Sequence, residues 1–208
     1  MILREALEQI PNIQSMGNPG VEICGIAYDS RSVQKGDLFV AIKGEKQDGA
    51  SFIAQALSRG AAAVASEESQ APAQAVTVVV PDARKFLAEI SRIFYGDPAA
   101  RLKLVGITGT KGKTTSSYLM DSIYSQAGIP SCLMGTIMMK IGSQIIQSHH
   151  TTPESSDLMK FLQQAAASGC THGALEVSSH SLALKRVFGA RFEVGVFTNL
   201  THDHLDFS

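Results

Sequence analysis

The sequence predicts an α/β protein with two domains, and three observations support this prediction. Short apolar segments of strand length alternate with segments whose apolar residues recur at helical spacing. The alternation breaks at Asp97-Pro98 and then begins again. The chain has 208 residues, which is enough for two domains of ordinary size. We therefore expect one domain over residues 1–98 and a second over 99–208, with a mainly parallel sheet in the second.

In the first half, the strand and helix patterns follow one another with short connections. The expected helices are 6–10, 50–60 and 83–96, and the expected strands are 21–30, 37–44, 61–67 and 76–80. Gly60 and Gly96 stand at the ends of the second and third helices, where glycine commonly terminates a helix.

The second half continues with the same alternation. We expect strands at 102–108, 131–135, 173–179 and 193–200, a hairpin over 136–148, and helices at 114–128, 153–169 and 181–187. The hairpin should turn at Gly142-Ser143. The helix at 153–169 is well marked, because Pro153 and acidic residues open it and Gly169 closes it.

Composition excludes several classes of protein. The formal net charge of −1 gives no overall field that would attract nucleic acid or anionic lipid. No apolar run has the length of a membrane span, and the charged N-terminal segment MILREALEQI is unlike a signal peptide. The cysteines are odd in number and lack CxxC spacing, which favours small buried residues over disulfides or a zinc site: Cys24, Cys132 and Cys170. We expect a soluble cytosolic protein that interacts with neither nucleic acid nor membrane.

The segment VGITGTKGKTT carries the strongest functional signal. An apolar strand leads into Gly106, Gly109 and Gly112, and Lys113-Thr114 begin a helix. Glycines let backbone N–H groups approach phosphate oxygens, and a helix N-terminus adds partial positive charge. The glycine at 106 lies one residue too early for the general GxxxxGK[ST] pattern, so Gly109-x-x-Gly112-Lys113-Thr114 describes the motif better. We interpret it as a nucleoside triphosphate site, in which Lys113 reaches the β- and γ-phosphates and Thr114 binds Mg²⁺.

Three further polar residues follow apolar strands. Glu176 ends one strand, His180 lies shortly after it, and His204 follows the last strand. Each alone is more typical of a solvated or structural residue. Because the carboxyl ends of parallel strands meet at one edge of a sheet, together they favour a functional cluster beside the phosphate loop, with Glu176 as a Mg²⁺ ligand.

Several motifs occur in an order that resembles the Mur ligases of peptidoglycan synthesis, in particular the MurE type. They are YDSRSVQKGDLFVAIKGEKQDGASFI, GITGTKGKTT, HHTTPES, EVSSHSLALKRV and FTNLTHDHLDFS. The resemblance covers almost the whole chain. It implies an N-terminal UDP-substrate-binding α/β domain followed by an incomplete, mainly parallel-sheet P-loop ATPase domain.

The resemblance also implies a reaction. Members of the family use ATP to convert a carboxylate of UDP-N-acetylmuramoyl-L-Ala-D-Glu into an acyl phosphate, which the amine of an incoming diamino acid then attacks. In the family, the chain continues to a carbamylated lysine and to a third domain that reads this amino acid. We therefore expect this chain to be a truncated part of a monomeric ligase and to be inactive alone. Whether the amino acid that is added, the third residue of the peptidoglycan stem peptide, is meso-diaminopimelate or L-Lys stays open.

By resemblance, the site residues form three sets. The ATP-binding set is Gly109, Thr110, Lys111, Gly112, Lys113, Thr114 and Thr115. The metal set is Thr114, Glu176 and His204, and the catalytic set is Lys113, Glu176 and His204. The substrate-binding set is Tyr28, Ser30, Glu45, Lys46, Gln47, His150, Thr151, Thr152, Ser178 and Arg186. Four residues depart from the usual pattern of the family: Lys111, His150, Leu184 and His202.

Three other functions remain as alternatives. A folylpolyglutamate-type or another Mur-type amide ligase would share the phosphate loop, although the YDSR and GEKQDG stretches favour a UDP-sugar. A non-catalytic sensor or scaffold would not require the retained residues Lys113, Thr114, Glu176 and His204. A GTPase or kinase lacks support, because no base-reading or acceptor motif follows the loop.

Overall fold

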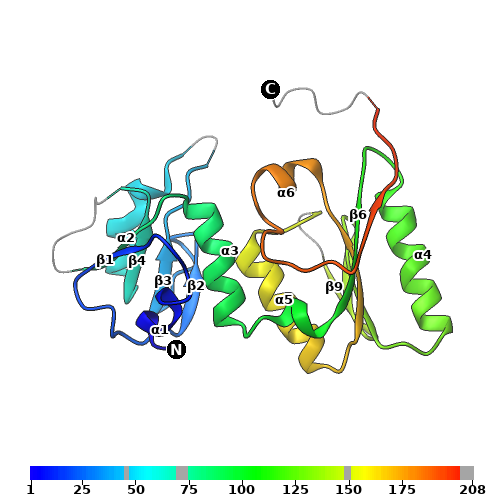
Figure 1. Ribbon diagram of the computed structural model, residues 1–208, viewed down its shortest axis with the longest axis horizontal. Helices are drawn as coiled ribbons and strands as arrows, with labels where there is room; N and C mark the ends of the chain where they lie inside the picture. Colours follow the sequence, from blue (N-terminus) through cyan, green and yellow to red (C-terminus); the bar gives the residue numbers. More distant parts are fainter. Residues whose placement is uncertain (45–46, 69–74, 148–150, 202–208) are drawn as a thin grey trace. The chain divides into compact units, whose positions relative to one another are not determined.

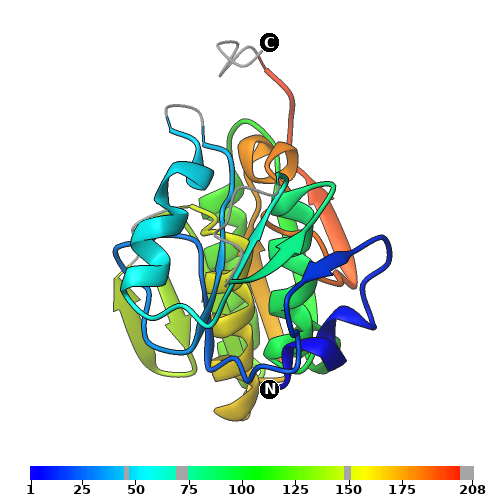
Figure 2. The same cartoon turned by 90° about the vertical axis from the view of Figure 1, so that its left-hand side faces the viewer.

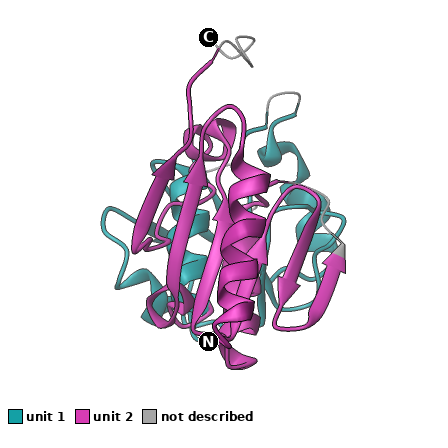
Figure 3. Cartoon of the chain, turned by 90° about the vertical axis from the view of Figure 1, so that its right-hand side faces the viewer, with its two compact units in different colours: residues 1–94 teal, residues 95–208 magenta. Residues whose placement is uncertain are grey.

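The computed structural model describes residues 1–44, 47–68, 75–147 and 151–201. The chain divides into two compact units, residues 1–94 and 95–208 (Figure 3). The first unit ends at Phe94, close to the domain boundary after residue 98 that was expected from the sequence. In the described residues, no helix is long and apolar enough to cross a membrane.

The first unit is built on a five-stranded sheet in the order β1-β5-β4-β3-β2. The strands are β1 (Gln14–Met16), β2 (Gly25–Ala27), β3 (Asp37–Val40), β4 (Ala63–Ser66) and β5 (Val76–Val79). β2 to β5 pair in parallel, and β1 pairs antiparallel with β5 at one edge (Figure 2). The sequence did not predict β1, because its residues QSM are exposed and carry no apolar pattern.

Helices cover this sheet. They are α1 (Leu3–Leu7), the 3₁₀ turn η1 (Gly49–Phe52), α2 (Ile53–Ser58) and α3 (Ala83–Phe94). The prediction of a first helix at 6–10 was wrong in position: α1 begins earlier because its buried side chains, Leu3 and Ala6, are three residues apart and lie on one face of the helix. Gly60 and Gly96 have positive φ angles of 98° and 73°, which confirms their role in ending helices.

The second unit contains a six-stranded sheet in the order β11-β6-β10-β7-β8-β9. The strands are β6 (Lys103–Thr108), β7 (Ser131–Met134), β8 (Met138–Ile141), β9 (Gln144–Gln147), β10 (His172–Glu176) and β11 (Val194–Phe197). The first four in spatial order are parallel, and β8 and β9 form an antiparallel hairpin at the opposite edge from β11 (Figure 3). The mainly parallel sheet and the hairpin turn at Gly142 are thus confirmed.

Two long helices cover opposite faces of this sheet, α4 (Lys113–Gln126) and α5 (Ser155–Ala167) (Figure 1). Leu158, Phe161 and Leu162 of α5 belong to the same buried cluster as Leu104 and Leu175 of the sheet. The short elements η2 (Pro98–Arg101) and α6 (Ser179–Ala183) complete the unit.

The register of the parallel strands brings three strand ends to one edge. Glu176, the last residue of β10, pairs with Ile107, and Phe197, the last residue of β11, pairs with Thr108. The segments that follow β6, β10 and β11 therefore leave the sheet side by side. This edge is where open parallel sheets place their ligands.

Candidate functional site

The phosphate loop connects β6 to α4. Gly109 and Gly112 have φ angles of 134° and 87°, conformations that residues with a side chain rarely adopt. Gly109 has a second constraint, because a Cβ there would collide with Thr198 and with the backbone of Asn199. Gly112 is the N-cap of α4, so the helix begins at Lys113. The loop therefore directs the amide groups of the first turn of a 14-residue helix to the carboxyl edge of the sheet.

Lys113 keeps its ammonium group at the loop. Its Nζ donates to the carbonyl oxygen of Gly109 at 2.6 Å and to that of Thr110 at 3.1 Å. Lys111 and Thr115 are exposed on either side of this position. The loop thus carries two cationic residues beside a helix N-terminus, which suits a ligand with several phosphate groups.

The segment after β11 holds the loop in place. Asn199 accepts hydrogen bonds from the loop N–H groups of Thr110 (3.0 Å) and Lys111 (3.1 Å), and donates from Nδ2 to the carbonyl of Lys111 (3.0 Å). Thr198 donates to the same carbonyl at 2.6 Å, and the N–H of Thr201 donates to the hydroxyl of Thr110 at 3.0 Å. Sequence reasoning missed these residues. The available signal was that polar residues directly follow an apolar strand adjacent to the loop strand.

Glu176 is the most buried acidic residue of the site, with no exposed surface. Its Oε2 accepts from the hydroxyls of Thr114 and Thr136, each at 3.0 Å. Its Oε1 accepts from the hydroxyl of Ser117 at 3.2 Å and from the N–H of Thr136 at 3.3 Å. The alternative of a solvated glutamate is therefore wrong. All four donors are neutral, so they satisfy the carboxylate without cancelling its charge.

The arrangement fits a magnesium ion. Thr114 and Glu176, the two described members of the predicted metal set, are in direct contact and present oxygen atoms. Mg²⁺ is commonly held by one or two carboxylates together with phosphate oxygens and water. The third predicted ligand, His204, lies outside the described residues, and within the described ranges no group of three His, Cys, Asp or Glu side chains is assembled. The fit thus rests on one carboxylate and one hydroxyl beside a phosphate loop.

The predicted muramoyl-dipeptide residues of the second unit lie around the same strand end. The hydroxyl of Thr151 is 3.0 Å from that of Thr136. Thr152 is buried and donates to the backbone carbonyl of Glu176 at 2.9 Å. Ser178 caps α6 by accepting from the N–H of Ser181 at 3.1 Å. His150 lies outside the described residues.

Arg186 is engaged within the chain. Its Nε donates to Glu154 at 2.9 Å, and its NH1 group donates to the carbonyl of Thr152 at 3.1 Å. Both side chains of the ion pair are largely buried, with 21 % and 11 % exposed. Arg186 therefore links the segment that follows α6 to the segment that precedes α5.

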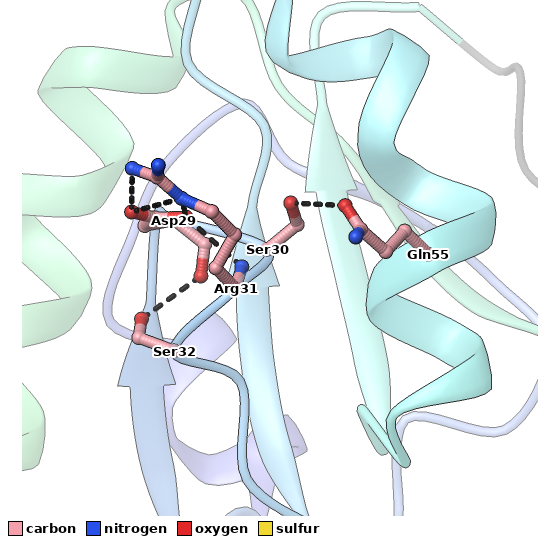
Figure 4. Close-up of polar contacts among 5 residues, drawn as sticks. All are labelled: Asp29, Ser30, Arg31, Ser32 and Gln55. Carbon is pink, nitrogen blue, oxygen red and sulfur yellow. Dashed lines mark hydrogen bonds and ion pairs between the residues drawn. The ribbon is translucent and has the colours of Figure 1, made fainter.

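The first unit has a pocket of its own, with a volume of about 590 Å³. Three predicted substrate residues line it, Tyr28, Ser30 and Gln47; the other predicted ones, Glu45 and Lys46, lie outside the described residues. Ser30 is nearly buried, and its hydroxyl donates to Oε1 of Gln55 at 2.7 Å (Figure 4). Sequence reasoning missed Gln55, which also lines the pocket.

An ion pair stands at the same pocket. The guanidinium of Arg31 binds both carboxylate oxygens of Asp29, at 2.7 to 3.1 Å (Figure 4). These hydrogen bonds hold the pKa of Asp29 below its usual value and raise the pKa of Arg31. Polar residues, among them this ion pair, thus line one pocket together with the aromatic side chains of Phe39 and Phe52, a mixture typical of small-molecule sites.

Comparisons with known proteins match both units. Residues 22–95 match the model described as "Mur ligase family, catalytic domain", and residues 107–208 match the "Mur ligase middle domain". UDP-N-acetylmuramoyl-L-alanyl-D-glutamate–2,6-diaminopimelate ligases from Clostridium perfringens and Geobacter sulfurreducens are 43 % and 44 % identical over 208 residues. All of this chain is aligned in both cases, but it spans only 43 % and 41 % of the lengths of these relatives.

Solved structures give the same result. The structure of a UDP-N-acetylmuramoyl-L-alanyl-D-glutamate–2,6-diaminopimelate ligase superposes with a TM-score of 0.83 and 31 % identity, covering 100 % of this chain and 42 % of that one. A MurF structure from Acinetobacter baumannii superposes with a TM-score of 0.67 over 97 % of this chain and 41 % of that one. Its identity of 23 % shows a shared fold alone.

Proposed function

The chain belongs to the Mur ligase family, as a member of the MurE type, and on that premise we propose the function of the whole protein. We propose that it is an ATP-dependent ligase of peptidoglycan precursor synthesis in the cytoplasm. Its substrates would be UDP-N-acetylmuramoyl-L-alanyl-D-glutamate, ATP and a diamino acid, for which the names of the relatives favour 2,6-diaminopimelate over L-lysine.

The contact between Thr114 and Glu176 beside the phosphate loop carries this proposal. It joins the helix that begins at the loop to the end of the neighbouring strand, and it supplies hard oxygen ligands where a triphosphate would lie. When bound there, Mg²⁺ would neutralise charge on the phosphate oxygens.

The proposed reaction has two steps. A substrate carboxylate oxygen attacks the γ-phosphorus of ATP and ADP leaves, which forms an acyl phosphate. The amine of the diamino acid then attacks the acyl carbon, loses a proton and expels phosphate, which leaves an amide. In the first step, the loop amides and the Lys113 ammonium would orient the triphosphate and stabilise the charge that develops on the transferred group.

Ser30, Tyr28 and Gln47 would bind the uridine nucleotide part in the pocket of the first unit. Thr151, Ser178 and Arg186 would lie along the muramoyl-dipeptide in the second unit. Arg186 would act there partly through Thr152, whose carbonyl it already binds.

Calorimetric titration of the chain tests each half of the proposal. A non-hydrolysable ATP analogue with Mg²⁺ should bind, and Lys113→Ala should weaken binding by about tenfold or more, since a charge-assisted hydrogen bond is lost. Lys160→Ala is the matched control, because Lys160 is exposed on α5. Equal affinity of the two variants would contradict the assignment of the phosphate loop.

The second half of the proposal, the nucleotide site in the pocket of the first unit, is tested with UDP-N-acetylmuramoyl-L-alanyl-D-glutamate as the ligand. Ser30→Ala should reduce its affinity about tenfold. Ser32→Ala is the control, because the Ser32 hydroxyl donates to the backbone of Asp29 and Ser32 does not line the pocket. A loss of affinity in both variants, or in neither, would argue against a nucleotide site at Ser30.

A further inference from the structure

Thr136 stands between the predicted metal carboxylate and the predicted substrate segment. It lies in the turn between β7 and β8, two residues after the end of β7. Its Oγ1 atom is 3.0 Å from Oε2 of Glu176 and 3.0 Å from Oγ1 of Thr151. Its N–H also donates to Oε1 of Glu176, at 3.3 Å. One exposed residue thus contacts both oxygens of a carboxylate that has no exposed surface.

The chemistry of these groups fixes the direction of the hydrogen bonds. An ionised carboxylate only accepts, and a hydroxyl has a single proton to donate. The proton of Thr136 therefore points to Glu176, and the hydrogen bond between the threonines must use the proton of Thr151. The result is a one-way chain from Thr151 through Thr136 to Glu176, in which each hydrogen bond polarises the next.

We propose that Thr136 is a positioning residue that orients Glu176 toward Thr114 for Mg²⁺ binding and links this carboxylate to the substrate segment at Thr151. This inference rests on the proposed function, because it assigns a role within the same nucleotide site. It also defines the chemistry at Thr151. With its proton committed to Thr136, the Thr151 hydroxyl interacts with the substrate as an acceptor, so it suits an amide N–H and not a carboxylate.

The contacts of Glu176 separate this role from general support of the fold. The hydrogen bonds of Oε1 come from the hydroxyl of Ser117 and the backbone N–H of Thr136, so they do not depend on the side chain at residue 136. Oε2, the oxygen that faces Thr114, depends on the Thr136 hydroxyl for its other hydrogen bond. Removing this hydroxyl frees that oxygen to turn while the buried core remains intact, because the Thr136 side chain is exposed.

The test compares Thr136→Val, which has the same shape without the hydroxyl, with Thr136→Ser, which keeps the hydroxyl. The measurement is the Mg²⁺ concentration that gives half-maximal binding of a non-hydrolysable ATP analogue to the chain, by calorimetry. Thr136→Val should raise it about tenfold, the size of effect typical of residues that orient metal ligands, and Thr136→Ser should restore it. Thr171→Val is the matched control, because Thr171 lies at the opposite end of β10 with its hydroxyl near the carbonyl of Pro130.

Each outcome has a distinct meaning. If the Val and Ser variants require the same Mg²⁺ concentration as the unsubstituted chain, the inference is overturned and the proposed function stands. If the unsubstituted chain does not bind the analogue at all, the assignment of the nucleotide site to this chain fails and the inference with it. If Thr136→Val does not fold, as judged by circular dichroism, Thr136→Ala gives the same comparison with less bulk in the turn.

A second readout needs no nucleotide. Crystal structures of Thr136→Val and Thr136→Ser without ligand should show the Glu176 carboxylate rotated away from Thr114 in the first variant and retained in the second. An unchanged carboxylate in Thr136→Val would overturn the inference.

Discussion

The hydroxyl of Thr114 donates to the carboxylate of Glu176 at 3.0 Å, across 62 residues of chain. Thr114 belongs to the first turn of α4, and Glu176 is the last residue of β10. The contact forms because β10 and β6 are parallel neighbours, so the end of β10 reaches the helix that the phosphate loop begins. Five predictions follow from this edge of the sheet, from the burial of the cysteines and from the pocket of the first unit.

Glu176→Gln should destabilise the second unit and weaken Mg²⁺-dependent nucleotide binding. In the variant only one side-chain oxygen remains to accept, and the charge-assisted hydrogen bonds to the carboxylate are replaced by weaker neutral ones. The expected loss is about 1–3 kcal/mol in the free energy of unfolding, measured by urea denaturation. Glu193→Gln, at an exposed glutamate beside β11, should change neither quantity. A Glu176→Gln variant as stable as the unsubstituted chain would show that its hydrogen bonds are replaceable.

Gly135→Ala should disturb the same carboxylate by steric means. A Cβ at residue 135 would collide with Oε1 of Glu176, whereas nothing lies within 4 Å of a Cβ built at Gly195 in the same sheet. We expect Gly135→Ala to lower the free energy of unfolding by about 1–3 kcal/mol, as overpacking does, and to weaken Mg²⁺-dependent binding. Gly195→Ala serves as the control in thermal denaturation. Similar melting temperatures for the two variants would contradict the tight packing of Gly135.

The cysteines should differ sharply in reactivity. Cys24 is exposed, whereas burial raises the pKa of the Cys132 thiol to about 12 from an ordinary value of 9.0. Labelling the native chain with a thiol reagent at pH 8 should therefore modify Cys24 and spare Cys132 and Cys170, which react only after unfolding. Rapid modification of Cys132 in the folded chain would contradict its burial.

The raised pKa of Cys132 also has a consequence for stability. The folded chain holds this proton more tightly than the unfolded chain, so the contribution of Cys132 is unaffected below about pH 9 and declines as the pH rises from 9 toward 12. Burial likewise raises the pKa of Tyr124, which acts in the same direction. Cys132→Ala should reduce the loss of stability between these pH values in denaturation experiments.

Arg31→Gln should raise the pKa of Asp29 toward its ordinary value of 3.8, because the hydrogen bonds of Arg31 are the main cause of its depression. NMR titration of the Asp29 carboxyl carbon measures this change. The ion pair's contribution to stability is present above that ordinary value and is lost as the pH falls through the lower pKa of the folded chain. Arg59 contributes only the smallest of the causes, so Arg59→Gln should give a smaller shift. An unchanged pKa in Arg31→Gln would show that the pair does not form in solution.

Local patterns predicted much of the fold and part of the site. The glycines at 109 and 112 form the turn between a strand and a helix that the motif predicted, and Glu176 ends a strand as its apolar run suggested. These features depend on residues close together in the sequence. Helix ends marked by Gly60, Gly96 and Gly169 were recognisable for the same reason.

Contacts between distant segments were not predictable in this way. Thr136, Asn199 and Gln55 are ordinary polar residues in their own segments, and their roles appear only when the sheets bring other segments beside them. The strand β1 was missed because its residues show no strand pattern of their own. It is a strand only because it pairs with β5. Arg186 shows the converse: the family resemblance suggested a ligand contact, and the fold supplies Glu154 as a partner.

The attachment of the phosphate loop to Thr198, Asn199 and Thr201 has a consequence for the order of folding. These hydrogen bonds join residues 87 to 91 positions apart, so the loop cannot reach its final shape until β11 has been synthesised and has paired with β6. Pairing over such sequence separations is slow compared with the formation of a helix or hairpin. During synthesis, a nascent chain that ends before β11 should contain the loop glycines and form α4, but its phosphate loop should not yet be ordered. The proposed affinity for ATP would then appear late, once β11 has completed the sheet.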